Sequence, residues 1–214
     1  MFVFVDLETT SRRPSSAEIL TADFISCDSD FNIIEKKHFE FRPRIWDKDA
    51  NEAAAIHGIS REQAYRFAPY SESASKMFDW LLGFDKSHMI SHANRMFNST
   101  YDQAILRLHA LDNDVYFEFG QSFPESKYIS THSLAKYLNV GSELNLKALC
   151  NYFKLGDFVH HNSAEDVMMT YKLFLELIPT VKINEFLDWE HYFKKGIKNE
   201  ESEKPTRRTK KNKT

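Results

Sequence analysis

The chain opens with an apolar run, Met1–Val5, that ends at two acids, Asp6 and Glu8. A short apolar run rich in Phe and Val is typical of a buried β-strand. Side chains alternate between the two faces of a strand, so acids separated by one residue leave the same face. The pattern therefore predicts a buried strand with a pair of carboxylates at its end.

Two further strands are predicted after short turns, at Ile19–Cys27 and at Phe31–Phe41. Farther along the chain, short apolar segments at Met89–His92 and Tyr128–Thr131 predict two more strands. Helical spacing or capping signals predict helices at Asn51–Ile56, Ser60–Gln63, Ser71–Leu82, Tyr101–Leu111, Ser133–Leu138, Leu146–Phe153, Ser163–Leu177 and Glu185–Phe193. A meander followed by alternating strands and helices predicts an α/β fold with a mixed five-stranded sheet and helices on both faces.

Length and composition limit the class of protein. A chain of 214 residues is long enough for one full domain, and no apolar run reaches the length of a membrane-spanning helix. The N-terminus enters a strand at once, without the pattern of a secretory leader. Cys27 and Cys150 lack metal-type spacing, which favours reduced thiols. We therefore expect a cytoplasmic protein with no membrane partner.

Charge is distributed unevenly along the chain. The segment Lys204–Thr214 holds six basic residues and no acid, so the remainder carries −9 although the whole chain carries −3. Dense charge and low hydrophobicity predict a disordered basic tail at 199–214, after a domain at 1–198. Such a tail either adds salt-sensitive affinity for nucleic acid or only keeps the protein soluble.

Two later acids are placed to join Asp6 and Glu8. Asp102 stands at the start of one predicted helix, and Asp166 lies in the first turn of the longest one, five residues after His161. If both helices pack beside the first strand, four carboxylates converge. Oxygen ligands of this kind suit Mg²⁺ or Mn²⁺, and two such ions can catalyse in-line displacement at phosphorus. A nearby histidine can accept a proton from the attacking water.

Each of these residues also has a simpler structural explanation. Asp6 and Glu8 fit an ordinary strand end. Asp102 can stabilise its helix through the helix dipole, and Asp166 can form a capping box with Ser163. The loop histidine can simply face solvent. The spacing permits a metal site without requiring one.

Three short motifs resemble those of the DnaQ-like (DEDDh) 3′–5′ exonucleases. They are Val5–Thr10 (VDLETT), Ile56–Ser60 (IHGIS) and His161–Asp166 (HNSAED). They occur in the family's order over residues 1–178, so the resemblance covers the whole domain. The chain length and the two adjacent histidines, His160 and His161, are similar to those of exonuclease X-like members.

The second motif departs from the family pattern. The family reads His-Asn-Ala-x-Phe-Asp, with the acid five residues after the histidine, whereas Asp102 follows His92 by ten residues. Tyr101 and Asp102 match the aromatic residue and the acid at the end of the family's second motif. We interpret the extra residues as a local insertion before the helix.

The resemblance implies a ribonuclease H-like fold and a hydrolase that removes nucleotides from the 3′ end of single-stranded or frayed DNA. It implies two Mg²⁺ ions, for which Mn²⁺ can substitute, and it makes His161 the general base. The implied metal ligands, which are catalytic with that histidine, are Asp6, Glu8, Asp102 and Asp166. The implied pocket for the last nucleotide is formed by Thr9, Thr10, Ile56 and His57.

Two alternatives remain open at this point. An exoribonuclease fits the same motifs, because nothing in the sequence identifies a reader of the 2′-hydroxyl. The fold also suits a proofreading or polymerase-associated subunit that acts mainly by binding, although the full set of acids favours an enzyme. The expected partners are nucleic acid with a free 3′ end and a DNA polymerase or another replication or repair protein.

Overall fold

The computed structural model describes residues 1–84, 87–93, 95–96, 99–113, 115 and 128–180. The predicted helix at Glu185–Phe193, the domain boundary at 198 and the basic tail lie outside the described residues. Within the described segments, no helix combines the length and the apolar character needed to cross a membrane.

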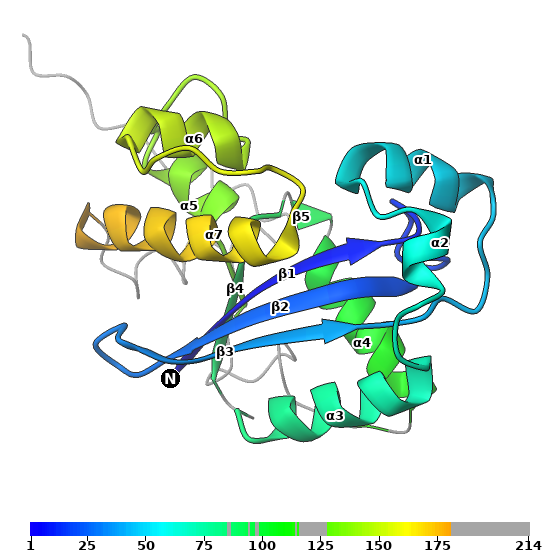
Figure 1. The fold of residues 1–214 in the computed structure, drawn as a ribbon. Coiled ribbons are helices and arrows are strands. Elements are labelled where there is room, and N and C mark those ends of the chain that lie inside the picture. Colours follow the sequence, from blue (N-terminus) through cyan, green and yellow to red (C-terminus); the bar gives the residue numbers. More distant parts are fainter. Residues whose placement is uncertain (85–86, 94, 97–98, 114, 116–127, 181–214) are drawn as a thin grey trace, which may run out of the picture.

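A five-stranded sheet with the strand order β3-β2-β1-β4-β7 forms the centre of the fold (Figure 1). Its strands are β1 (Phe2–Thr9), β2 (Ile19–Cys27), β3 (Ile33–Glu40), β4 (His88–Ser91) and β7 (Tyr128–Ser130). Strand β2 pairs antiparallel with β1 and with β3, whereas β4 pairs parallel with β1 and with β7. This is the mixed sheet that the sequence predicts.

Helices cover both faces of this sheet, as predicted. They are α1 (Lys48–His57), α2 (Arg61–Ala64), α3 (Tyr70–Leu82), α4 (Tyr101–Asp112), α5 (Thr131–Tyr137), α6 (Leu146–Phe153) and α7 (Ser163–Leu177), with a 3-10 turn at Ile178–Thr180. Helices α3 and α4 lie on one face, α5 to α7 lie on the other, and α1 and α2 lie near the end of β1 (Figure 1). A small hairpin, β5 (Arg95–Met96) and β6 (Ser99–Thr100), occupies the insertion before α4.

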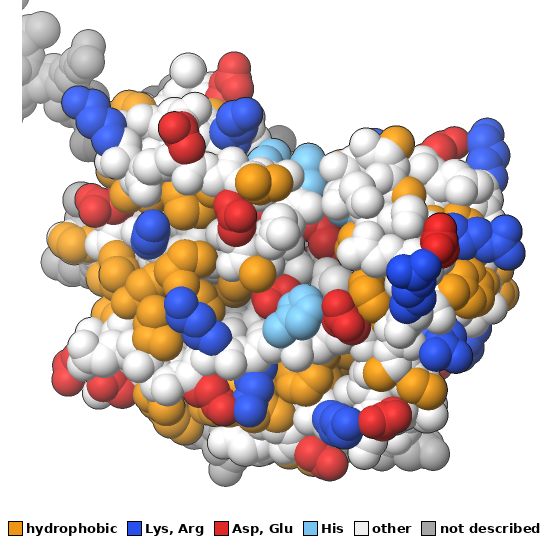
Figure 2. All heavy atoms as spheres, in the orientation of Figure 1, with side chains coloured by type: hydrophobic (Ala, Val, Ile, Leu, Met, Phe, Trp, Pro, Cys, Tyr) orange, Lys and Arg blue, Asp and Glu red, His pale blue; other side chains and the backbone are white. Residues whose placement is uncertain are grey.

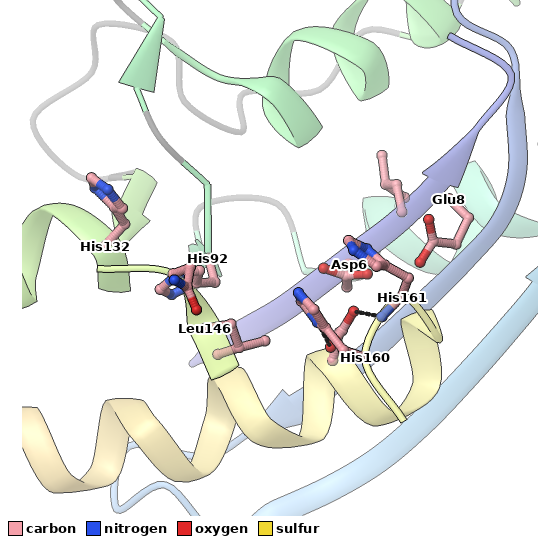
Figure 3. A pocket seen from close by; sticks show the side chains of 10 residues that line it. Asp6, Glu8, His92, His132, Leu146, His160 and His161 are labelled. Carbon is pink, nitrogen blue, oxygen red and sulfur yellow. Dashed lines mark hydrogen bonds and ion pairs between the residues drawn. The ribbon is translucent and has the colours of Figure 1, made fainter. Parts of the chain in front are cut away.

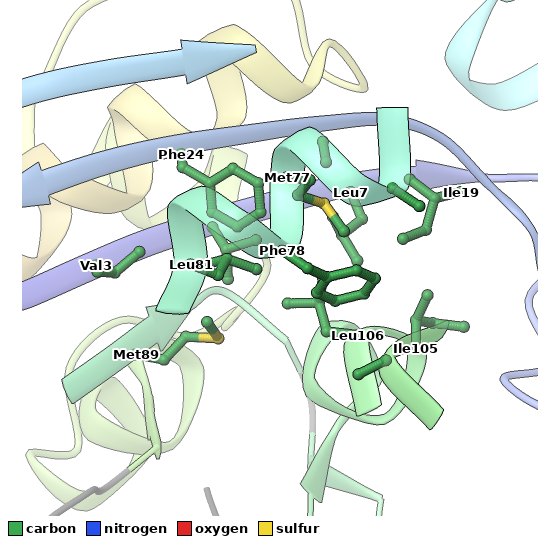
Figure 4. Packing of buried hydrophobic residues seen from close by; sticks show 14 of the residues in the cluster. Val3, Leu7, Ile19, Phe24, Met77, Phe78, Leu81, Met89, Ile105 and Leu106 are labelled. Carbon is green, nitrogen blue, oxygen red and sulfur yellow. The ribbon is translucent and has the colours of Figure 1, made fainter. Parts of the chain in front are cut away.

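Strand β1 separates two hydrophobic clusters because its side chains alternate between faces. Val3 and Leu7 belong to the cluster with α3 and α4 (Figure 4). Phe4 belongs to the opposite cluster, with α5, α6 and α7. Asp6 and Glu8 continue the row of Phe4, so the two acids emerge on the side of the sheet that α7 covers.

Local sequence signals set several helix ends. Ser60 caps α2 by accepting a hydrogen bond from the amide of Gln63 at 3.1 Å, as its capping-box pattern predicts. Gly58 ends α1 in the left-handed conformation, with φ of 77°. A side chain at that position would be strained, which explains the glycine in the His-Gly-Ile segment.

Phe174 of α7 is the anchor of the second cluster, and we predict a large loss of stability when it is truncated. Its side chain is fully buried, with the rings of Phe4 and Phe31 each centred 5.4 Å away. Phe174→Ala should lower the free energy of unfolding by about 3–5 kcal/mol, measured by urea denaturation, because it leaves a cavity. Leu111→Ala, at a side chain that is 68% exposed, should change it by less than about 0.5 kcal/mol. Equal losses in both variants would contradict this account of the core.

Candidate active site

Three carboxylates meet at the C-terminal end of β1. Asp6 and Glu8 come from the strand and Asp166 comes from the first turn of α7, with one oxygen of each within 4.8 Å of the others. Figure 3 shows the two strand acids facing the loop that carries His160 and His161. The structure therefore brings together residues that are about 160 positions apart in the chain, on the one face where the strand period places the acids.

Asp166 is held by the loop that precedes its helix. Its Oδ2 accepts a hydrogen bond from the backbone amide of His161 at 2.9 Å, and its Oδ1 lies 3.0 Å from Nδ1 of His160. Asn162, and not Ser163, supplies the side chain that caps α7. Asp166 is therefore not the capping-box partner of Ser163, and its carboxylate is oriented toward the acids of β1.

The two loop histidines occupy different positions. The ring of His160 bonds to Asp166 and stacks on the ring of His161, with the centroids 4.0 Å apart. His161 is exposed, and its φ of 66° is uncommon for a residue other than glycine. Partial burial, and then the neighbouring His160, lower the pKa of His161 below the ordinary histidine value. The His161 ring is therefore neutral near pH 7 and able to accept a proton.

Asp102 lies near these acids despite its longer spacing from His92. The hairpin β5–β6 takes up part of the insertion, and α4 then begins at Tyr101, whose hydroxyl bonds to Oγ1 of Thr9 at 2.6 Å. Asp102 is buried and accepts a hydrogen bond from the side chain of Ser91. After burial itself, the charge of Asp102 is the strongest influence that raises the pKa of Asp6. Asp102 thus belongs to the same electrostatic group, beside the three-carboxylate cluster.

Burial, joined at Asp6 and Glu8 by the charges of neighbouring acids, raises the pKa of all four carboxylates. Burial, followed by the neighbouring acids, raises the pKa of Asp6 well above its ordinary value and that of Glu8 to about 8. Burial also raises the pKa of Asp102 to about 6 and that of Asp166 above its usual range. Like charges this close do not all ionise without a counterion. A hard divalent cation fits this all-oxygen donor set and would supply that charge.

A cavity of about 410 Å³ lies over the acids. Its lining residues are Asp6, Leu7, Glu8, His92, His132, Asn145, Leu146, His160, His161 and Asp166. In the space-filling view, acidic and histidine side chains gather in the hollow between the α5–α7 helices and α1–α2 (Figure 2). The cavity is thus polar at the acids and bordered by imidazole rings, as a site for an anionic ligand with a metal would be.

The residues predicted to hold the last nucleotide are absent from the lining of this cavity. The hydroxyl of Thr9 donates to the carbonyl of Ser11 at 2.9 Å, and that of Thr10 accepts from the amide of Glu18 at 3.0 Å. Both hydroxyls therefore stabilise the connection between β1 and β2. His57 is close enough to the loop histidines for His161 to lower its pKa, after the larger effect of burial. The role of Thr9, Thr10, Ile56 and His57 in binding a nucleotide stays a prediction.

Two histidines of the site were missed or misjudged from the sequence. His132, which belongs to none of the sequence motifs, lines the cavity with His92, and their rings are 6.0 Å apart. Burial lowers the pKa of His92 to about 4. The sequence could have indicated His92 by its position, because it directly follows β4 and therefore lies at the same edge of the sheet as Asp6 and Glu8.

One acid of the site was also missed. Asp23 on β2 is the register partner of Asp6, and its charge contributes to the raised pKa of both Asp6 and Glu8. The sequence could have indicated Asp23, because it is an isolated acid within the apolar strand Ile19–Cys27. His38 on β3 bonds to Asp23.

Comparison with known proteins identifies the family. The exonuclease family model, RNase_T, matches residues 3–174. The chain belongs to the exonuclease family. This confirms the DnaQ-like resemblance of the sequence motifs at the level of the family, whereas the narrower similarity to exonuclease X stays a prediction.

The curated relatives of this exonuclease-family chain include DNA polymerase III PolC-type proteins. Those of Thermotoga petrophila and Thermotoga maritima are each 26% identical over 182 residues, which is 85% of this chain but only 12% of the relatives' length. Among solved structures, Escherichia coli exonuclease I in complex with a dT13 oligonucleotide has a TM-score of 0.69, and its zinc-bound complex with single-stranded DNA has 0.70. Both are 18% identical and cover 88% of this chain and 42% of theirs. These structures confirm the ribonuclease H-like fold.

The raised pKa of Glu8 predicts a pH-dependent penalty on the metal-free fold. The ordinary pKa is 4.5 and burial with the nearby acids raises it to about 8, so the folded state retains a proton that the unfolded chain has lost. The contribution of Glu8 to the free energy of unfolding therefore falls as pH rises through this window. In EDTA, Glu8→Gln should gain stability relative to the wild type between about pH 5 and about pH 8.

Urea denaturation of both proteins across this pH range measures the difference, and the comparison cancels titrating groups that do not interact with Glu8, such as His92. Glu176→Gln, an exposed change on α7, should follow the wild type at each pH. Saturating Mg²⁺ should stabilise the wild type more than Glu8→Gln at the upper pH. A stability difference that stays constant with pH would refute the crowding of Glu8.

Proposed function

We propose that this chain is a divalent-metal-dependent 3′–5′ exonuclease that hydrolyses phosphodiester bonds at the 3′ end of single-stranded or frayed DNA. The observation that carries the proposal is the cluster of Asp6, Glu8 and Asp166, with a neutral, exposed His161 beside it. The cavity of about 410 Å³ above them lies within the range of small-molecule sites and suits a terminal nucleotide.

Asp6, Glu8 and Asp166 would hold the more tightly bound of two divalent cations, and Asp102 would act at the edge of the site, largely through water. Carboxylate oxygens are the donors that Mg²⁺ and Mn²⁺ prefer. Such ions supply Lewis acidity that polarises the scissile phosphate and the attacking water. Their binding would also relieve the repulsion from neighbouring acids that, after burial, raises the pKa of Asp6 and Glu8.

The protein's own groups would orient the reactants and move the proton. His161 would accept the proton of the attacking water, and its lowered pKa keeps the ring in the accepting form. The backbone amide of His161 donates to Asp166, so one contact holds the base and a metal ligand together. His160 would orient the same carboxylate through its ring nitrogen.

DNA is the proposed substrate on the basis of similar proteins. Exonuclease I of Escherichia coli has been solved with a dT13 oligonucleotide, and the Thermotoga relatives are DNA polymerases. Those properties belong to the other proteins and support the proposal for this chain. Association with a DNA polymerase is proposed on the same ground.

Removal of one ligand charge should abolish the activity. Asp166→Asn should slow the shortening of 5′-labelled single-stranded DNA in Mg²⁺ by at least about 100-fold, because even residues that only orient metal ligands cost 10–100-fold when lost. The matched control is Asp157→Asn, which changes an exposed acid of the preceding loop and should stay within about twofold of the wild type.

A denaturing gel with 5′-labelled DNA and its RNA counterpart reads out polarity and sugar preference together. Release of the label in a short fragment from the 5′ end would show digestion from the 5′ end or internal cleavage. Full activity of Asp166→Asn would remove the basis of the proposed function, and faster digestion of RNA would favour the exoribonuclease.

The two loop histidines make distinct kinetic predictions. His161→Gln should lower kcat by about 10²–10⁴-fold, the usual contribution of a general base, while calorimetric Mn²⁺ affinity changes little. His160→Gln should weaken Mn²⁺ binding more than His161→Gln does, because His160 bonds to Asp166. If His160→Gln instead showed the larger loss of kcat with unchanged Mn²⁺ binding, the base would be His160.

A further inference from the structure

A buried polar network joins the sheet to the start of α7, among residues that carry no role in the proposed reaction. Asp23 on β2 is 5% exposed, and its Oδ2 accepts a hydrogen bond from Oγ of Ser163 at 2.6 Å. Both Asp23 oxygens lie 2.9 Å from Nδ1 of His38 on β3. The Ser163 hydroxyl also bonds to Oγ1 of Thr21 at 2.8 Å. Three elements are therefore tied together through one carboxylate.

The network lies at the level of the acidic cluster. Asp23 is the register partner of Asp6, so its side chain emerges on the face that α7 covers. Ser163 is the first residue of α7, three positions before Asp166. The Ser163 hydroxyl bonds both Asp23 and Thr21 and so joins the first turn of α7 to β2. Asp166 lies in that same turn, close to the acids of β1.

Packing alone does not account for this arrangement. A buried carboxylate is costly unless its oxygens are bonded, and here it lies beside acids that already repel one another. Hydrogen bonds from Ser163 and His38 satisfy the Asp23 oxygens, and His38 gains positive character from Asp23, which raises its pKa. Directional bonds of this kind hold a helix end in one position, whereas apolar contacts tolerate small shifts.

We propose that Asp23, Ser163 and His38 are positioning residues that fix the N-terminus of α7 on the sheet and so hold Asp166 in register with the acids of β1 for metal binding. The inference rests on the proposed function, since it takes a divalent cation to be the ligand of those acids. None of the three residues belongs to the carboxylate cluster itself. Their effect is on the geometry of the ligand set.

The test is direct titration of the metal-free, full-length protein with Mn²⁺ by isothermal calorimetry. Ser163→Ala should weaken Mn²⁺ binding about tenfold, the lower end of the cost of losing a residue that orients metal ligands. Ser163→Thr keeps the hydroxyl and should restore most of the affinity. Asp23→Ala combined with Ser163→Ala should lose less Mn²⁺ affinity than the two single losses added together, because the Asp23–Ser163 hydrogen bond is removed by either change.

Ser26→Ala is the matched control. Ser26 is also a buried serine on β2, but its hydroxyl donates to the carbonyl of Glu35 on β3 and not to α7. It should leave the Mn²⁺ affinity within about twofold of the wild type. Equal affinities of Ser163→Ala and Ser26→Ala, or equal losses in Ser163→Ala and Ser163→Thr, would overturn the proposal.

A second variant keeps the test valid if Ser163→Ala does not fold. The His38 side chain is 49% exposed, so His38→Gln removes a partner of Asp23 with little effect on the core. Weakened Mn²⁺ binding in His38→Gln supports the proposal, and unchanged binding overturns it.

The outcomes also separate this inference from the proposed function. A wild-type protein that binds Mn²⁺ but does not shorten DNA refutes the activity, while the calorimetric comparison still decides the positioning role. Normal exonuclease activity with unchanged Mn²⁺ affinity in Ser163→Ala overturns the positioning role alone. A wild type that does not bind Mn²⁺ overturns both.

Discussion

The burial of carboxylates gathered at the end of β1, together with the repulsion between them, is the constraint on which the rest of the structure depends. The hydrophobic clusters on both faces of the sheet hold β1 and α7 together, so Asp6, Glu8 and Asp166 are not free to move apart. Without a counterion, burial and then the neighbouring acids raise the pKa of Glu8 to about 8, so this carboxyl retains its proton at neutral pH. The fold thus maintains a cluster that is unfavourable by itself and that a bound cation, as proposed, would stabilise.

Helix α7 connects the stability of the core with the geometry of the site. Its inner face packs in the cluster that contains Phe4 and Phe174, whereas its first turn carries Asp166. Two sets of hydrogen bonds act on that turn: the loop histidines bond to Asp166, and the Ser163 hydroxyl donates to Asp23. A shift of this helix end by a fraction of an ångström would change the ligand geometry without disturbing most of the core, because the apolar contacts extend along the later turns.

The sequence pattern predicts the observed helices and strands best where it extends without interruption over a long segment. The bounds of β2, α6 and α7 are those predicted from the sequence, because each combines a sustained apolar period with a clear cap or turn. The hairpin β5–β6 was anticipated only as an insertion, since strands of two residues are too short to show a period. The capping-box explanation of Asp166 failed because Asn162 competes with Ser163 for the same role, and adjacent capping residues are not distinguished by pattern.

The sequence by itself determined the strand that carries Asp6 and Glu8, the face from which they emerge, and the motif that pairs His161 with Asp166, because each depends on residues within a few positions of one another. Only the tertiary structure decided that Asp102 joins the acids after its insertion, that His160 bonds to Asp166, and that Asp23 meets Ser163 across 140 positions of chain. Contacts of that kind depend on how α4 and α7 pack on the sheet. Local periodicity places side chains on faces, but the packing of whole elements determines which faces meet.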